Sequence, residues 1–184
     1  MNKNSIIEKT AEYVKSRLES DSSGHDWWHV YRVWKTAVKI GKKEKADLFV
    51  IELAALLHDI ADFKLHKGDD NIGPRAAKKW LEKLEVDKKT ISQVCKIIYE
   101  SGSKNARAEY KIKNKEGAIV QDADRLDAIG AIGIARCFAY VGHKGAPIYD
   151  PKIKVKIHQS DKEIKKATNP AINHFYERLL LLKD

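Results

Sequence analysis

Two histidines and two aspartates of this chain combine the side-chain types that hold divalent metals: His29, His58, Asp59 and Asp124. His58-Asp59 is the most unusual pair, because it directly follows residues 48–57, the most apolar helical segment of the chain. A buried imidazole beside a buried carboxylate costs free energy unless the two are paired or bound to a cation. One interpretation is structural, with Asp59 capping a neighbouring helix and His58 donating a hydrogen bond in the core. The other interpretation is a metal site.

Acidic residues also gather in a second segment, where Asp122, Asp124 and Asp127 precede a run of small and apolar residues. The helix dipole stabilises acids at a helix N-terminus, which explains Asp122 better than Asp124. Gly130 and Gly133 each cost about 1 kcal/mol in a helix interior relative to alanine. Together with the small residues around them, they predict that another helix packs very closely here. Either Asp122 or Asp124 could be the last metal ligand.

His29 completes the set, one turn into another amphipathic segment. An isolated histidine on such a helix is more often a core residue than a ligand. Together, however, two imidazoles and two carboxylates come from three helices. This mixture suits Mn, Fe, Co, Ni or Zn and leaves positions open for water and substrate oxygens. The other histidines are assigned to packing or capping (His25, His143, His158 and His174) or left without a role (His66).

Apolar residues at helical spacing predict that helices position these groups. The segment 48–57 is apolar nearly all round and is expected to be the central, buried helix. The other predicted helices lie near residues 6–18, 26–40 (stopping at Gly41), 74–84, 87–98, 118–140 and 170–180. The predicted loops are residues 102–116 and 142–151, and residues 152–166 are either a short strand or a loop. No repeat and no convincing sheet is evident, so the predicted fold class is all-α.

Length and composition exclude several classes of protein. The chain has 184 residues, the usual size of one domain, and a formal net charge of +9 from 35 Lys and Arg against 26 Asp and Glu. No apolar run approaches the roughly 20 residues of a membrane span, and the N-terminus lacks the apolar core of a signal peptide. The two cysteines, Cys95 and Cys137, fit buried thiols in a reducing cytosol. We therefore expect a cytoplasmic protein without a membrane partner.

The residues named above resemble the H…HD…D signature of the HD-domain metal-dependent phosphohydrolases. Residues 25–33 (HDWWHVYRV), 56–62 (LLHDIAD) and 121–130 (QDADRLDAIG) look like motifs of the small bacterial single-domain HD hydrolases. Some of that group are nucleoside triphosphate pyrophosphohydrolases. The resemblance runs from about residue 20 to 180 and includes residues 173–177 (NHFYE). An HD dipeptide alone is weak evidence, whereas the ordered set in these contexts is specific.

The resemblance implies a single HD domain over residues 1–184, an all-α helical bundle with a buried metal site. Its motif-bearing core would span about residues 20–140, with the C-terminal loop and helix, 141–184, packed on it. By motif position, the ligands of one divalent ion (Mn, Co, Ni, Fe, Zn or Mg) would be His29, His58, Asp59 and Asp124. Only His66 lies between the HD pair and the last aspartate, which argues against the second metal that some members bind.

The resemblance also implies roles in catalysis. Asp62 lies one helical turn after Asp59, where related enzymes carry an acid, often Glu, that helps to activate the attacking water. Lys64 and Arg125 are candidates for phosphate contacts, and Arg32 for a structural cation. The implied reaction is hydrolysis of a phosphate ester or anhydride. The expected substrate is a phosphorylated small molecule, a nucleotide in the first instance.

The competing hypothesis is a basic helical protein that binds nucleic acid or another macromolecule without catalysis. Its support is the positive charge, with basic tracts at residues 35–45, 104–115 and 152–166. These lysines are scattered over several segments without a recognition helix, and the hypothesis leaves His58-Asp59 unexplained. We therefore do not expect nucleic acid as a partner. The sequence leaves a homodimer open.

Overall fold

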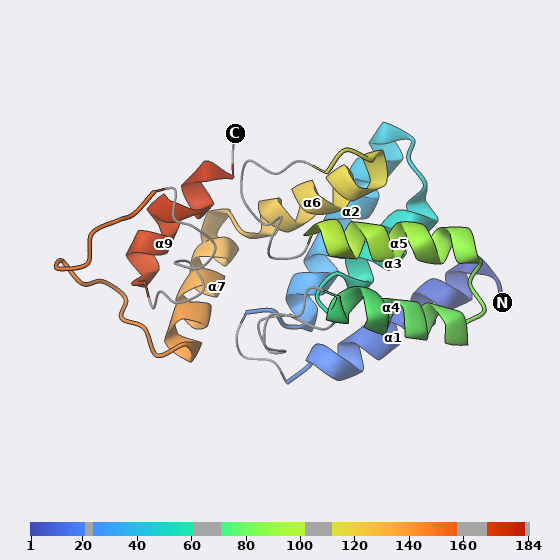
Figure 1. The fold of residues 1–184 in the computed structure, drawn as a ribbon, viewed down its shortest axis with the longest axis horizontal. Helices are drawn as coiled ribbons and strands as arrows, with labels where there is room; N and C mark the ends of the chain where they lie inside the picture. Colours follow the sequence, from blue (N-terminus) through green and yellow to red (C-terminus); the bar gives the residue numbers. More distant parts are fainter. Residues whose placement is uncertain (21–23, 61–70, 102–111, 158–168, 183–184) are drawn as a thin grey trace.

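The computed structural model describes residues 1–184 except 21–23, 61–70, 102–111, 158–168 and 183–184. Every regular element among the described residues is helical (Figure 1). In chain order the elements are α1 (Lys3–Leu18), α2 (Trp27–Glu44), α3 (Leu48–Leu57), α4 (Ile72–Lys83), α5 (Lys88–Ser101), α6 (Lys115–Asp127), α7 (Gly130–His143), α9 (Ala171–Glu177) and the 3-10 helix η2 (Leu179–Leu181). The predicted all-α fold is confirmed. No described helix is both long and apolar enough to cross a lipid bilayer.

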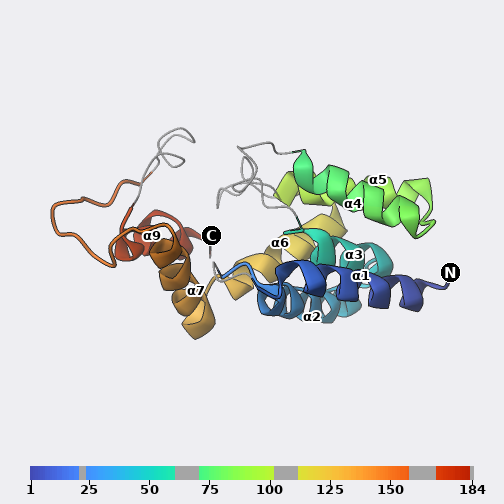
Figure 2. The same cartoon turned by 90° about the horizontal axis from the view of Figure 1, so that it is seen from below.

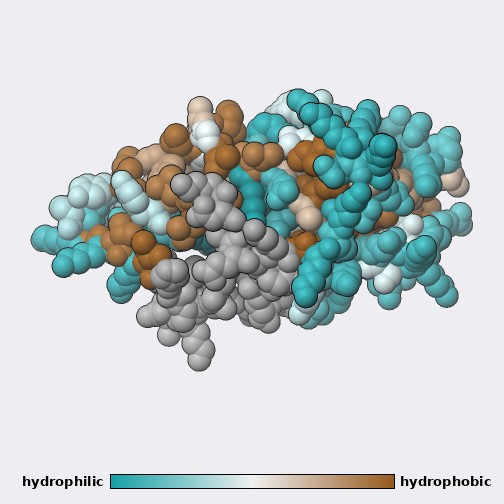
Figure 3. Space-filling model, turned by 90° about the horizontal axis from the view of Figure 1, so that it is seen from above, coloured by the Kyte–Doolittle hydropathy of each residue, from teal (hydrophilic) through white to brown (hydrophobic). Residues whose placement is uncertain are grey.

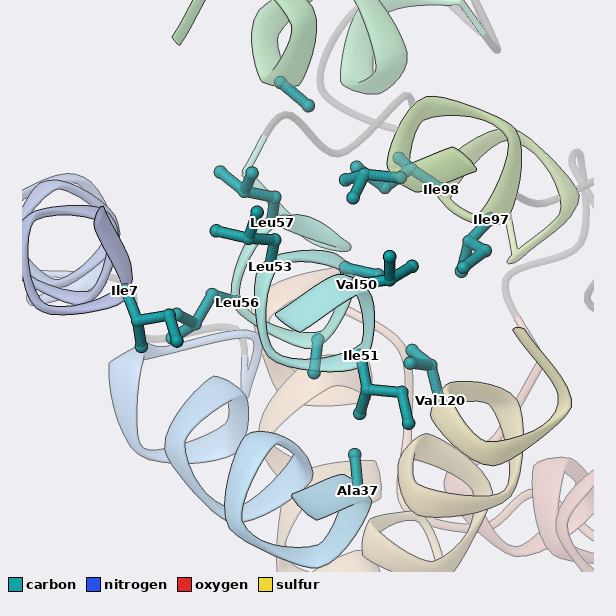
Figure 4. Close-up of a cluster of buried hydrophobic side chains, with 14 of the residues drawn as sticks. Ile7, Ala37, Val50, Ile51, Leu53, Leu56, Leu57, Ile97, Ile98 and Val120 are labelled. Carbon is teal, nitrogen blue, oxygen red and sulfur yellow. The ribbon is translucent and has the colours of Figure 1, made fainter. Parts of the chain in front are cut away.

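α3 is the centre of the fold, as its apolar sequence predicts. Eight of its ten residues are buried, and α1, α2, α5 and α6 pack around it (Figure 2). Figure 4 shows Ile51 of α3 near Ala37 of α2 and Val120 of α6, while Leu56 faces Ile7 of α1. Burial of a Leu or Ile side chain contributes roughly 1.5–3 kcal/mol. This packing fixes the C-terminal end of α3, where the HD pair follows.

α2 packs on both α3 and α6 and begins at a capped turn. Asp26 is the cap, and its carboxylate accepts a hydrogen bond of 2.9 Å from the backbone N–H of His29. The sequence predicts that this helix stops at Gly41, but in the structure it continues to Glu44. Gly41 is buried against α3, where a Cβ atom would lie 2.7 Å from Ile51 Cδ1. This glycine therefore permits close packing of α2 on α3 and does not end the helix.

The single helix predicted over residues 118–140 is wrong, because the structure has two helices there. α6 ends at Asp127 and α7 begins at Gly130, whose φ of 73° is in the left-handed region that glycine adopts readily. At Gly133 a Cβ atom would lie 2.3 Å from the backbone carbonyl of Ala128. The expected close approach of another helix is also wrong, since a Cβ at Gly130 would meet nothing within 4 Å. The glycines form a corner between α6 and α7.

α7 and α9 form a second, smaller hydrophobic cluster beside the core around α3 (Figure 1). The buried members of this cluster are Cys137, Val141 and Ala171. The rings of Phe138 and Phe175 pack against it, with centroids 6.1 Å apart. Apolar side chains also reach the surface in this part of the molecule (Figure 3), and Ile132 and Ile134 of α7 are both exposed. Residues 152–157, the described part of the stretch 152–166, contain no strand.

Candidate metal centre

Three elements bring the predicted metal ligands to one place. His29 lies in the first turn of α2, His58 and Asp59 directly follow α3, and Asp124 lies near the end of α6. α2 packs against both α3 and α6, so side chains from all three can meet. The His29 and His58 side chains are only 1% and 5% exposed, whereas that of Asp124 is 46% exposed. Among the described residues, the cluster therefore runs from the core to the surface.

The Nε2 atoms of the two histidines converge on the two carboxylates. His29 Nε2 lies 3.2 Å from His58 Nε2, 3.3 Å from Asp59 Oδ2 and 3.4 Å from Asp124 Oδ1. His58 Nε2 lies 3.5 Å from the same Asp59 atom and 3.9 Å from the same Asp124 atom. The structure thus brings all four predicted ligands together. Asp124 is the acid beside the histidines, whereas Asp122 is exposed on α6.

Hydrogen bonds on the far side of each ring decide which nitrogen faces the cluster. His58 Nδ1 lies 2.8 Å from the carbonyl oxygen of Ala55, which can only accept, so this nitrogen carries a proton. His29 Nδ1 donates in the same way to Asp127 Oδ2 at 2.8 Å. In neutral rings both Nε2 atoms are then bare acceptors. Two such lone pairs 3.2 Å apart repel each other unless a positive charge lies between them.

A divalent metal ion fits this spacing and this donor set. Because metal bonds to imidazole nitrogen and carboxylate oxygen are about 2.0–2.2 Å long, neighbouring ligand atoms lie about 3.0 Å apart in octahedral and about 3.4 Å apart in tetrahedral geometry. The five distances in the cluster, 3.2–3.9 Å, are close to these values. Mixed nitrogen and oxygen ligands suit first-row transition metals. The cluster can therefore hold a divalent ion.

The pKa shifts of His29 and Asp59 also indicate that the cluster favours a positive charge. Burial alone would lower the pKa of His29, but its hydrogen bonds to Asp127 and Asp59 raise that pKa to about 9. Burial would raise the pKa of Asp59, but the charges of His58 and His25 hold that pKa well below its ordinary value. A proton on His29 thus occupies the position that suits a metal ion.

His25, for which the sequence predicts packing or capping, belongs to this cluster. Its Nδ1 lies 2.8 Å from Asp59 Oδ2, and its ring meets the ring of His29 edge-on, with centroids 5.7 Å apart. The ligand atoms of His25, His29 and Asp59 form a second group that could hold a metal ion. The sequence signal that could have identified His25 is its position just before the Asp26 cap and four residues before His29.

Asp127, one of the three acids noted in the sequence, is the other site residue to which the sequence assigns no role. Its side chain is 8% exposed and accepts hydrogen bonds from His29 Nδ1, from Arg32 Nε at 2.6 Å and from Arg136 at 3.0 Å. Burial would raise the pKa of Asp127, but the bonds from His29 and Arg32 hold that pKa far below its ordinary value. Arg32 is thus a structural cation, as predicted. The signal for Asp127 is its spacing of three residues from Asp124, which places both on one face of α6.

The remaining predicted site residues are placed differently. Asp62, the predicted base, and Lys64, a predicted phosphate contact, lie outside the described residues, as does His66. Arg125 follows Asp124 on α6 and is half-buried. His174 is half-buried on α9. The described residues therefore contain all four predicted ligands but not the predicted base.

Residues 27–129 match the family model of the HD domain, which covers more than half of the chain. The chain belongs to the HD-domain family. The matched segment begins with α2, ends between α6 and α7, and includes His29, His58, Asp59 and Asp124. The resemblance inferred from the motifs is thus confirmed. HD-superfamily hydrolases are generally metal-dependent phosphohydrolases, and HD domains bind divalent metal.

Several bacterial proteins are similar to this HD-domain chain over nearly its whole length. Bacillus subtilis YpgQ is 40% identical over 183 residues, which cover 96% of this chain and 78% of YpgQ. A crystal structure from Lactobacillus plantarum matches with a TM-score of 0.85 and 34% identity, over 99% of this chain and 84% of that one. An HD-superfamily hydrolase from Bacillus thuringiensis matches with a TM-score of 0.69 and 43% identity, over 100% of this chain and 83% of that one. The crystal structure of YpgQ in complex with ADP matches with a TM-score of 0.70 and 37% identity, over 96% of this chain and 80% of that one.

Proposed function

We propose that this HD-superfamily hydrolase cleaves a phosphate ester or phosphoanhydride bond of a nucleotide, in the manner of a nucleoside triphosphate pyrophosphohydrolase. One divalent ion bound by His29, His58, Asp59 and Asp124 would support the reaction. The observation that carries the proposal is the convergence of two imidazole Nε2 atoms, 3.2 Å apart, on two carboxylate oxygens, an arrangement that favours a positive charge between them. A basic protein that only bound a partner would have no need of this cluster.

The substrate class rests on charge and on one relative. The net charge of +9 favours a polyanionic ligand. YpgQ, which shares the HD-domain fold of this chain, has been crystallised in complex with ADP. ADP contains both a phosphate ester and a phosphoanhydride bond, the two bond types that a phosphohydrolase cleaves. A nucleotide is therefore the substrate class to test first.

The proposed mechanism divides the work among residues of the chain. A bound divalent ion supplies Lewis-acid chemistry, acidifying water and polarising a phosphoryl oxygen. His29 and His58 would offer Nε2 to the ion, because hydrogen bonds to Asp127 and to the carbonyl of Ala55 occupy their Nδ1 atoms, and His29 would give up its second ring proton. The carboxylates of Asp59 and Asp124 offset the two positive charges of the ion.

Proton transfer and phosphate binding fall to residues outside the ligand set. Asp62, three residues after Asp59, is the proposed acceptor of the proton from the attacking water. Lys64 and Arg125 are the proposed phosphate contacts, since phosphoryl transfer depends chiefly on positioning and on neutralising charge.

Metal removal and reconstitution test the proposal directly. The protein is stripped with EDTA, dialysed, and supplied separately with Mn²⁺, Co²⁺, Ni²⁺, Zn²⁺ or Mg²⁺. We expect one bound ion per chain and restored hydrolysis of at least one nucleoside triphosphate. Release of pyrophosphate or of orthophosphate then identifies the bond that is cleaved. Full turnover in excess EDTA, or no turnover with nucleotides and simple phosphate esters in the presence of any of these ions, would contradict the proposal.

A further inference from the structure

Asp127 lies directly behind the candidate metal centre, at the C-terminal end of α6. Its Oδ2 accepts from His29 Nδ1 at 2.8 Å, on the side of the ring opposite the atom that faces the other ligands. The carboxylate also accepts two hydrogen bonds from Arg32, from Nε at 2.6 Å and from the terminal nitrogen at 3.0 Å. A further bond of 3.0 Å comes from Arg136 of α7. One buried carboxylate thus joins α2, α6 and α7.

The two arginines hold the carboxylate of Asp127 in one orientation. Arg32 binds in the bidentate manner that suits a planar guanidinium and a carboxylate. Arg136 approaches from another helix, so rotation of the carboxylate would break bonds on both sides. A carboxylate that is fixed in this way presents a fixed acceptor to His29.

A fixed acceptor in turn fixes the ring of His29. If the ring turned over about its Cβ–Cγ bond, a carbon would face Asp127 and a buried charge-assisted hydrogen bond would be lost. The bond also keeps the proton on Nδ1, so that Nε2 remains a donor to metal. Carboxylates in this position raise the basicity of a histidine ligand and set its orientation.

The same network reaches a second predicted ligand by another route. Arg136 Nε donates to the carbonyl oxygen of Gly24 at 2.7 Å. Gly24 immediately precedes His25, whose Nδ1 lies 2.8 Å from Asp59 Oδ2. Asp127 and Arg136 therefore brace the segment that carries His25 as well as the ring of His29.

We propose that Asp127 is a positioning residue of the metal centre, which holds His29 with Nε2 directed at the ion while Arg32 and Arg136 anchor its carboxylate. The inference rests on the proposed metal-binding role of His29. It assigns the affinity for metal and the geometry of the site to a residue that does not itself touch the ion.

The test compares Asp127→Asn with Asp122→Asn, which removes the same charge from an exposed position on the same helix. Each metal-stripped protein is titrated with Co²⁺, and the visible absorption of the bound ion reports both affinity and coordination geometry. We expect Asp127→Asn to bind Co²⁺ roughly 10- to 100-fold more weakly than the wild type, with an altered spectrum. Asp122→Asn should match the wild type. Circular dichroism confirms that each variant is folded.

The outcomes separate this inference from the proposed function. If the wild type and a folded Asp127→Asn variant bind Co²⁺ with equal affinity and identical spectra, the positioning role is wrong while the proposed function stands. If the wild type itself binds no Co²⁺, the proposed metal centre fails and the positioning role fails with it. Should Asp127→Asn not fold, Arg136→Gln decides, because it removes one of the two anchors that orient the Asp127 carboxylate towards His29. An unchanged Co²⁺ affinity and spectrum for Arg136→Gln would then overturn the inference.

Discussion

His29 Nε2 and His58 Nε2 face each other at 3.2 Å, and each ring is held by a hydrogen bond on its opposite side. The two ring planes lie at 73°, so the rings do not stack. Two neutral imidazoles in this arrangement would gain no hydrogen bond between them. A positive charge between the two nitrogens explains the relationship, supplied by a proton on His29 when no metal is bound, or by one ion with both nitrogens as ligands.

Substitution of the HD pair should remove the metal and leave the helices. We expect His58→Ala and Asp59→Ala to bind no stoichiometric metal, because each removes one of the four side chains that converge on the proposed ion. The helical signal in circular dichroism should remain, since both residues follow the last buried turn of α3. His143→Ala is the matched control, because His143 is exposed at the end of α7. Stoichiometric metal in either variant would place the site elsewhere.

Asp62→Asn should separate proton transfer from metal binding. The amide keeps the volume of the side chain but cannot accept a proton from water. General-base catalysis typically contributes 10²–10⁴-fold, so we expect kcat to fall by about this factor while the metal content stays near that of the wild type. Metal content, melting temperature and kcat are measured on one preparation. Loss of metal together with activity would make Asp62 a ligand, and near-normal kcat would remove it from the mechanism.

Alanine substitution should have opposite effects on stability at two glycines of α7, Gly133 at the corner with α6 and Gly142 near the other end. Gly133→Ala would place a Cβ atom 2.3 Å from the Ala128 backbone, so we expect a loss of about 1–3 kcal/mol in the free energy of unfolding. Gly142→Ala meets nothing within 4 Å and should be neutral or stabilising by up to about 1 kcal/mol. Denaturant unfolding of both variants measures the difference. Equal stability of the two variants would contradict the described corner.

The thiol of Cys137 should react slowly in the folded protein. Burial raises its pKa from 9.0 to about 11. At pH 9 the thiolate fraction falls from about one half to about 1%, so alkylation by iodoacetamide should be about fiftyfold slower than for an unperturbed cysteine. A Cys95→Ser background isolates this thiol, and the same protein in guanidinium chloride provides the unfolded rate. Equal rates in the two conditions would show that Cys137 is accessible as thiolate.

The same pKa shift has a defined sign for stability. The neutral thiol of Cys137 is favoured in the fold, so its contribution is fully present below about pH 9, the ordinary value, and is lost as the pH rises towards 11. The melting temperature should therefore fall over this alkaline range. Cys137→Ala should show a smaller fall over the same range.

Local patterns in the sequence predict much of the fold because they report burial directly. Residues 48–57 are apolar on nearly every face, which favours a helix surrounded by others, and α3 is that helix. Asp26 and Asp47 are typical caps, and both accept backbone hydrogen bonds at helix starts. Gly41 and Gly130 show the limit of such patterns. A glycine can end a helix, admit a neighbouring helix or turn the chain, and only the tertiary structure distinguishes these roles.

The candidate site, like the fold, is predicted from the sequence only in part. The metal-ligand types and their order along the chain are visible in the sequence, and the structure brings His29, His58, Asp59 and Asp124 together. The sequence does not show the residues that support these ligands. His25, which precedes the Asp26 cap, and Asp127, the third aspartate of its segment, could each have many partners. The role of Asp127 depends on Arg32 and Arg136, and residue spacing alone does not show that both reach it.

Gly130 also determines the path of the chain between Asp127 and Arg136. In an unbroken α-helix nine residues advance about 13.5 Å along the axis and about two and a half turns around it. Arg136 would then emerge from the opposite side of the helix, beyond reach of the carboxylate. With the left-handed residue at the corner, the guanidinium instead lies 3.0 Å from Asp127 Oδ2. The turn at Gly130 thereby allows Arg136 to pair with Asp127.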